Sequence, residues 1–123
     1  MINFLPINPD EVKAGFPEFY DSDKDFYEII QQDIPIGFYG IKRINSLVCE
    51  ISVYIHEEHR NKICKITAFS CLRFPFTLGF VRIFISTRLD KMCRFLKRMS
   101  KHGVKYVDKC TNFYWFEVNN EFR

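Results

Sequence analysis

The chain has 123 residues, a length that fits one domain and is short for two. Hydrophobic residues make up 47% of it and aromatic residues 17%, including 14 phenylalanines, which excludes an intrinsically disordered chain. The net charge of +3 is unevenly spread, because residues 1–58 carry four basic and eleven acidic side chains, whereas residues 59–123 carry fourteen basic and four acidic ones. This asymmetry indicates either a surface for a polyanion or two oppositely charged halves that pack together.

The cysteines and the N-terminus indicate the cellular compartment in which the chain is expected. Five cysteines, an odd number without a Cys-x-x-Cys pair, predict buried apolar side chains in a reducing compartment. His56 and His59 have no further ligand at a suitable spacing, so we expect no metal site. The segment Met1–Pro9 does not resemble a signal peptide, and no apolar run is long enough to span a bilayer. The sequence predicts one cytosolic domain over residues 1–123, without a membrane partner.

The first part of the chain predicts one strand and two helices. Residues Asn3–Ile7 fit a short strand, and Asn8 fits the N-cap of a helix that ends at Gly15. A second helix is expected from about residue 21 to residue 32, capped by an aspartate or a serine. Its inner face would carry Phe26, Ile29 and Ile30.

The middle of the chain predicts an antiparallel hairpin. A strand from about Ile34 to Gly40 leads through a polar turn at residues 43–46 into the clearest alternation in the chain. One face of the second strand carries Leu47, Cys49, Ile51, Val53 and Ile55, and the other carries Val48, Glu50, Ser52, Tyr54 and His56.

The remaining elements alternate between helices and strands. A helical period runs from His56 to about Leu72, and Pro75 and Gly79 are expected to break the chain. A buried strand, an amphipathic helix with Gly103 as its C-cap, and two last strands follow over residues 80–86, 87–102, 104–108 and 112–118. The inner face of that helix would carry Leu89, Met92, Cys93, Leu96 and Met99. This order predicts a mixed sheet covered by helices.

Two segments resemble the GNAT superfamily of acetyltransferases. Cys49-Glu-Ile-Ser-Val-Tyr-Ile-His-Glu-Glu-His-Arg-Asn-Lys-Ile-Cys-Lys65 is similar to that superfamily's fourth strand and following helix, and the segment 85–104 is similar to its fifth strand and fourth helix. The resemblance extends over about residues 35–118 and rests on element order more than on identity. It implies an α/β (α+β) fold, with a GNAT-like mixed, mostly antiparallel sheet flanked by helices on both faces.

The cofactor motif implied by this resemblance is altered. GNAT enzymes hold the pyrophosphate of acetyl-CoA in an Arg/Gln-x-x-Gly-x-Gly/Ala loop, where glycines let the backbone amides approach phosphate closely. Arg60 occupies the first position here, but Ile63 and Lys65 stand where the glycines are expected. A β-branched Ile63 would obstruct the approach, and Lys65 could supply charge but not space. We therefore expect no bound cofactor, with acetyl-CoA as the one candidate.

The catalytic positions implied by the resemblance are also incomplete. Glu50 lies near the strand position from which many relatives take a general base. The alternative is a solvent-facing or hydrogen-bonded strand residue, and that interpretation is favoured because the cofactor loop is altered. Phe95 stands where many relatives keep a tyrosine general acid, and it has no proton to give. Acetyl transfer is therefore not expected.

Two further features indicate a contact surface. The helix over residues 88–102 carries six cations that spacing places mostly on one face, where they would serve an acidic protein partner or nucleic acid, or simply be solvated. The run Phe113–Phe116 alternates between two sheet faces, so one aromatic pair is either exposed for docking or covered by helices. The candidate partner contacts are Arg88, Lys91, Arg94, Lys97, Arg98, Lys101, Tyr114 and Phe116.

The altered motif and the abundance of phenylalanine resemble small, degenerate GNAT-like accessory proteins of short-tailed bacteriophages. That resemblance implies a non-enzymatic role in head assembly or in placing ejected proteins, through contacts with phage structural or ejection proteins, in the host bacterial cytoplasm or in the virion. Two alternatives stay open. One is an active acetyl-CoA-dependent N-acyltransferase with Glu50 as base, and the other is a small nucleic-acid-binding module that uses the basic helix.

Overall fold

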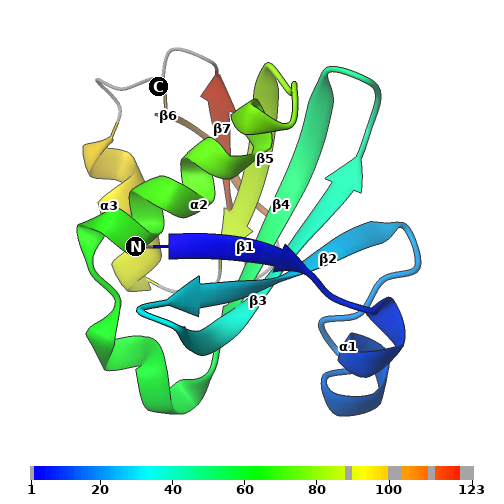
Figure 1. Ribbon diagram of the computed structural model, residues 1–123. Coiled ribbons are helices and arrows are strands. Elements are labelled where there is room, and N and C mark those ends of the chain that lie inside the picture. The colour runs from blue at the N-terminus through cyan, green and yellow to red at the C-terminus, as the bar shows by residue number, and fades with distance from the viewer. Residues whose placement is uncertain (1, 88–89, 100–103, 111–112, 120–123) are drawn as a thin grey trace.

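The computed structural model describes residues 2–87, 90–99, 104–110 and 113–119, which form a seven-stranded sheet with helices on both faces (Figure 1). The strands are β1 (Ile2–Pro6), β2 (Lys24–Gln31), β3 (Ile34–Arg43), β4 (Val48–Ile55), β5 (Arg82–Thr87), β6 (Val104–Cys110) and β7 (Phe113–Asn119). The helices are α1 (Pro9–Gly15), η1 (Glu57–Lys62, a 3-10 helix), α2 (Lys65–Thr77) and α3 (Asp90–Arg98).

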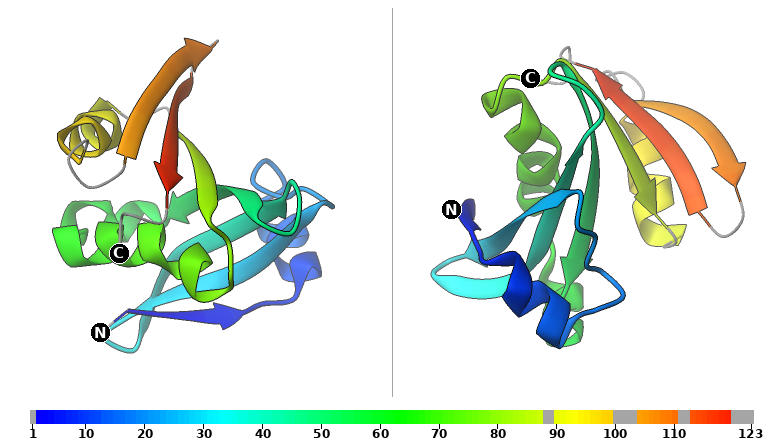
Figure 2. Two further views of the ribbon diagram at one scale, coloured as in Figure 1. Left: turned by 90° about the horizontal axis from the view of Figure 1, so that it is seen from above. Right: turned by 90° about the vertical axis from the view of Figure 1, so that its right-hand side faces the viewer.

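The sheet has the strand order β1-β2-β3-β4-β5-β7-β6. Strands β4 and β5 are parallel, and every other neighbouring pair is antiparallel. The parallel pair marks the chain's crossover through α2, and it divides the sheet into an N-terminal and a C-terminal part (Figure 2). The expected mixed, mostly antiparallel sheet is confirmed.

Two apolar clusters hold the helices against the sheet. In the main core, residues from β2–β7 pack against α2 and α3, and its fully buried members include Ile51, Ile83, Leu96, Phe116 and Val118. On the opposite face, Val12 of α1 packs against Phe26 and Phe38. Helices α2 and α3 therefore cover one face of the sheet, and α1 covers part of the other.

Strand β2 corrects the prediction of a second helix, because Lys24–Gln31 is a strand paired with β1 and β3. Phe26 packs in the cluster under α1, whereas Ile29 lies in the main core on the opposite face. Both faces of this strand are covered, and a bulge between Ile29 and Ile30 shifts the register. The apolar residues therefore lose the alternation of a strand and imitate helical spacing.

The turn between β2 and β3 offers a first test of local strain. Gln31 pairs with Ile34, and the two loop residues Gln32 and Asp33 have φ of 51° and 64°. Positive φ at both central residues defines the tight hairpin turn that favours Asn-Gly, and it costs an ordinary side chain about 1 kcal/mol. The double variant Gln32→Asn, Asp33→Gly should raise the free energy of unfolding by about 0.5–1 kcal/mol in urea titrations.

A turn residue without this strain provides the control for that measurement. Ser22 lies in an exposed turn and has no positive φ. Ser22→Gly should leave stability unchanged or lower it, because glycine there adds freedom to the unfolded chain without relieving strain. Equal gains in both variants would refute the strain at Gln32 and Asp33.

The hairpin of β3 and β4 confirms the prediction for the middle of the chain. Cys49 and Ile51 of β4 are fully buried, but Leu47 lies outside the strand in the turn and is 53% exposed. Near the end of β4, a Cβ on Gly37 would collide with the Tyr54 carbonyl oxygen and approach Ile55 Cα to 2.9 Å. Glycine is required at this position because the two backbones come unusually close.

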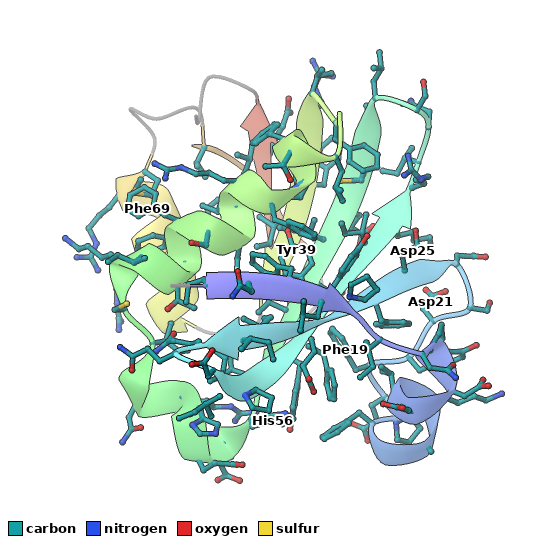
Figure 3. The ribbon with its side chains drawn as sticks, in the orientation of Figure 1. Phe19, Asp21, Asp25, Tyr39, His56 and Phe69 are labelled. Atoms are coloured by element: carbon teal, nitrogen blue, oxygen red, sulfur yellow. The ribbon has the colours of Figure 1, made fainter. Side chains whose placement is uncertain are left out.

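The region after β4 departs from the predicted continuous helix. Ile63 and Cys64 are extended and separate η1 from α2. The break expected at Pro75 is wrong, because Pro75 lies inside α2, which ends at Thr77. Pro75 has no N–H for the carbonyl of Cys71 one turn earlier, and the buried Tyr39 hydroxyl donates to that carbonyl at 2.6 Å (Figure 3). A side chain from the sheet thus replaces the missing helical bond.

Helix α3 is described over a shorter range than predicted. Thr87, the expected first residue of this helix, belongs to β5. Cys93, Leu96 and Met99 are buried as expected, whereas Leu89, Gly103 and the side chain of Met92 lie outside the described residues. None of the described helices is both long enough and apolar enough to span a membrane.

Candidate active site

The parallel strands β4 and β5 separate part-way along their length. They pair only from Val48 to Ile51 and from Arg82 to Ile85, although β4 continues to Ile55. The last residues of β5 pair with β7 on its other side. Within the described residues, the edge of β4 that faces β5 therefore has no strand partner beyond Ile51, and Figure 2 shows the two strands diverging.

The N-terminus of α2 has features of an anion site. Cys64 is its N-cap and makes no side-chain cap, and the first turn contains no acidic residue. Lys65 occupies the first helical position and is exposed. A helix N-terminus carries a partial positive charge, so a lysine there is unfavourable in the absence of an anion. The charge and the amides of this turn together suit a phosphate group.

The thiol of Cys64 takes part in a short polar chain at this helix end. Its Sγ lies 3.5 Å from the hydroxyl of the buried Thr67, which donates to Gln31 Oε1 at 2.6 Å. Hydrogen bonding with the side chain of Thr67 and with nearby backbone groups lowers the pKa of the Cys64 thiol. By contrast, burial raises the pKa of the Cys49 and Cys71 thiols to about 12, so neither is a nucleophile at neutral pH.

The opposite face of β4 carries the candidate base. Glu50, Ser52 and Tyr54 alternate with buried residues and point to the side of the sheet that α1 partly covers. Glu50 is half-buried and lies opposite Lys42 of β3 and Phe84 of β5. Ser52 Oγ is buried and has no hydrogen-bond partner within the described part of the chain. A carboxylate and an unsatisfied hydroxyl therefore lie where β4 leaves β5.

Comparison with solved structures assigns the fold. The chain superposes on Campylobacter jejuni N-acetyltransferase PseH, solved in complex with acetyl coenzyme A, with a TM-score of 0.63 and 14% identity over 98% of this chain and 99% of that one. A mutant of the spermidine N-acetyltransferase SpeG from Vibrio cholerae gives 0.67 and 12% over 96% and 93%. A GNAT family acetyltransferase from Elizabethkingia anophelis with acetyl-CoA bound gives 0.63 and 14% over 96% and 97%.

The chain has the GNAT fold. This confirms the fold that the sequence implied, although no family model and no curated protein matches the sequence itself. The implied kinship with phage accessory proteins finds no support in these comparisons, and the assembly role stays a prediction. Two of these neighbouring structures, from Campylobacter jejuni and Elizabethkingia anophelis, contain bound acetyl-CoA.

The three motif residues are arranged differently from a simple phosphate loop. Arg60 donates from Nε to the Ile55 carbonyl at 2.9 Å, and its guanidinium lies 5.6 Å from the Tyr54 ring centroid. Its side chain therefore packs over the last residues of β4. Ile63 is half-buried and packs against the main core. Arg60 and Lys65 are both exposed, and of the three residues Lys65 is the one that belongs to the first turn of α2. Lys65 thus adds a charge at this helix end, whereas the Ile63 side chain turns into the core and Arg60 bonds to the end of β4.

The other candidate residues fall in three groups. Phe95 packs between the helices, 6.0 Å from Phe69 of α2, which suits its apolar chemistry. Phe116 is fully buried in the main core, so its prediction as a surface contact is wrong. The described cations of α3 that are exposed are Arg94, Lys97 and Arg98, whereas Arg88, Lys101 and the side chains of Lys91 and Tyr114 lie outside the described residues.

Two polar residues of this site were not found from the sequence. Lys24 was assigned to a helix, and only its place in β2 puts it on the same sheet face as Glu50. Ser52 was given no role, because a serine on the outer face of a strand is ordinary. Within the described residues, no three histidine, cysteine or acidic side chains come together as metal ligands.

Proposed function

We propose that this chain binds an acyl-CoA thioester and transfers the acyl group to a primary amine. The observation that carries the proposal is the separation of β4 from β5 beyond Ile51, at the same end of the sheet as an uncapped, cationic helix N-terminus. An extended thioester arm can pair with the free edge of β4, and a pyrophosphate suits the first turn of α2.

The packing of Ile63 removes an objection from the sequence. Its backbone is extended, with φ of −72° and ψ of 123°, a conformation that does not require glycine. Its side chain packs against the main core rather than standing free at the helix end. The loss of glycine at this position therefore leaves the α2 amides open to an anion, and Lys65 adds a positive charge to them.

Glu50 supplies the chemistry that acyl transfer requires. A neutral amine attacks the thioester carbonyl, a C–N bond forms, the C–S bond breaks, and the thiol of CoA leaves. The amine must lose a proton, and a half-buried carboxylate on the open side of β4 is placed to accept it. Spermidine, named in the function of the Vibrio cholerae neighbours, is a reasonable first acceptor to test beside other primary amines.

Reversal of charge at Lys65 tests the cofactor end of the proposal. Lys65→Glu should weaken acetyl-CoA binding roughly three- to thirtyfold, because it removes a cation and adds an anion at the helix N-terminus. The same change should raise the stability of the unliganded protein by about 0.5 kcal/mol, since acidic residues are favourable there. Thermal shifts with and without acetyl-CoA measure both effects.

The matched control for this test is Lys13→Glu, which makes the same charge change in the last turn of α1. It should leave acetyl-CoA affinity unchanged. If millimolar acetyl-CoA does not raise the melting temperature of the unsubstituted chain, the proposed function is contradicted. That result would favour the assembly role.

A further inference from the structure

Lys24 occupies an unusual place for a lysine, on the inner part of a sheet face. Its Cδ lies 3.2 Å from the point that a Cβ on Gly40 would occupy, and Ser52 Oγ lies 2.9 Å from the same point. The missing side chain of Gly40 therefore leaves a slot across β3, and the lysine stem fills it. This slot directs the side chain from β2 toward Ser52, the first residue of β4 beyond its pairing with β5.

In the described part of the chain, the amine of Lys24 makes no ion pair, because the nearby Asp21 is paired with Lys42. Asp21, the acid that precedes β2, forms an ion pair with the neighbouring Lys42, with 3.8 Å between Oδ2 and Nζ. The Nζ of Lys24 instead lies 5.4 Å from the Phe19 ring centroid. Lys24 and Lys42 are direct cross-strand neighbours, and Lys42 is in turn opposite Glu50. Lys24 is thus a cation held beside another cation, two strands from Glu50 and within reach of its charge.

Burial lowers the pKa of Lys24, and repulsion from Lys42 acts in the same direction. Attraction to Asp21 and Glu50 opposes this shift without cancelling it. A lysine with a lowered pKa has a larger fraction of neutral, nucleophilic amine near neutral pH than an ordinary lysine. The lowered pKa and the position of Lys24 therefore both favour reaction of its amine as a nucleophile.

We propose that Lys24 is an internal acyl acceptor, modified by the acyl-CoA that the same chain binds, an inference that rests on the proposed function. The neutral Nζ attacks the thioester carbonyl, the new C–N bond forms, and the C–S bond breaks. The amine's surplus proton passes to Glu50, and CoA leaves as the thiol or thiolate. The acyl-lysine has lost its charge, and its amide can bond to the unpartnered Ser52 hydroxyl.

This modification would act on the site itself. The lysine stem already occupies the slot above Gly40, so an acyl group on Nζ adds bulk beyond it on the sheet face that carries Glu50. Acylation also removes one of the two cations on this face. The added bulk would hinder an external amine that approaches β4 from the α1 side. The acylated chain should therefore transfer more slowly to external amines than the unmodified chain.

The experiment is incubation of the purified, folded chain with acetyl-CoA, followed by intact-mass and peptide mass spectrometry. We expect one acetyl group per chain on Lys24, at a rate that does not depend on protein concentration. Lys24→Arg should abolish it, whereas the control Lys42→Arg should leave it. Glu50→Gln should slow it about a hundredfold or more. The same chain unfolded in urea should lose the preference for Lys24.

The outcomes separate this inference from the proposed function. Acetyl-CoA binding is measured independently by thermal shift. Binding without modification of Lys24, or modification spread over the exposed lysines, would overturn the inference and leave the proposed function standing. Absence of binding would overturn both. Thermal melts of Lys24→Arg and Lys42→Arg show whether each variant is folded, so that loss of acetylation in a folded variant is informative.

Discussion

Glu50→Gln should lower turnover about a hundred- to ten-thousandfold, with acetyl-CoA affinity nearly unchanged. The substitution keeps the size of the side chain and removes its capacity to accept a proton from the attacking amine. Glu50 lies on the face of β4 opposite the main core, so the change leaves the packing of Cys49 and Ile51 intact. Steady-state release of CoA in the presence of whichever primary amine supports turnover measures the effect.

The control for this prediction is Glu28→Gln. Glu28 is also a half-buried carboxylate on the same face of the sheet, in the row that contains Phe38 and Tyr54, but it lies two strands away from β4. Its replacement should change turnover by less than about twofold, in line with substitutions away from reacting groups. Equal losses in both variants would mean that net charge, rather than a base at Glu50, governs the rate.

The fold could be predicted where one pattern dominated each segment. The alternation of β4 over Val48–Ile55 and the inward row of Cys93, Leu96 and Met99 each follow one buried face, and the cap at Asn8 is a local hydrogen bond. Strand β2 could not be predicted in the same way. Phe26 and Ile29 are buried on opposite faces, and a bulge shifts the pairing between Ile29 and Ile30. A strand covered on both faces carries no simple period.

The site was predicted only in part, for a related reason. Glu50 was a candidate from the family resemblance, and the correctly predicted strand gave its face of the sheet, while its role as a base stays a prediction. Lys24 and Ser52 gain meaning only from the slot above Gly40, which depends on the register of three consecutive strands and on which face each side chain takes. Ile63 was interpreted as an obstruction because its identity was known but its direction was not. Sequence motifs give residue types, whereas the access of a ligand depends on where each side chain packs.

The same dependence on a distant partner explains why Pro75 was mistaken for a helix breaker. A proline inside a helix usually costs about 3 kcal/mol, partly because a carbonyl loses its partner. Here the carbonyl of Cys71 receives the Tyr39 hydroxyl instead, and both residues are buried. No local pattern in α2 could reveal a donor that comes from β3, 32 residues earlier in the chain.

Tyr39→Phe should therefore lower the free energy of unfolding by about 1–3 kcal/mol, because it leaves a buried carbonyl without a donor. Tyr27→Phe is the matched control. The Tyr27 ring also packs edge-on against Phe74, but its hydroxyl has no hydrogen bond within the described residues, so its loss should cost little. Urea titrations of the two variants compare the loss of a buried hydroxyl that bonds to the protein with the loss of a partly exposed one that does not.

Repeating Tyr39→Phe in a Pro75→Ala background shows whether its cost comes from the lost hydrogen bond or from ring packing. Pro75→Ala restores an N–H one turn after Cys71, so the carbonyl regains a helical donor and no longer depends on Tyr39. In that background the cost of Tyr39→Phe should fall below about 1 kcal/mol, a coupling that a double-mutant cycle measures directly. An undiminished cost would assign the effect of Tyr39 to ring packing, and would mean that α2 accommodates its proline without help from the sheet.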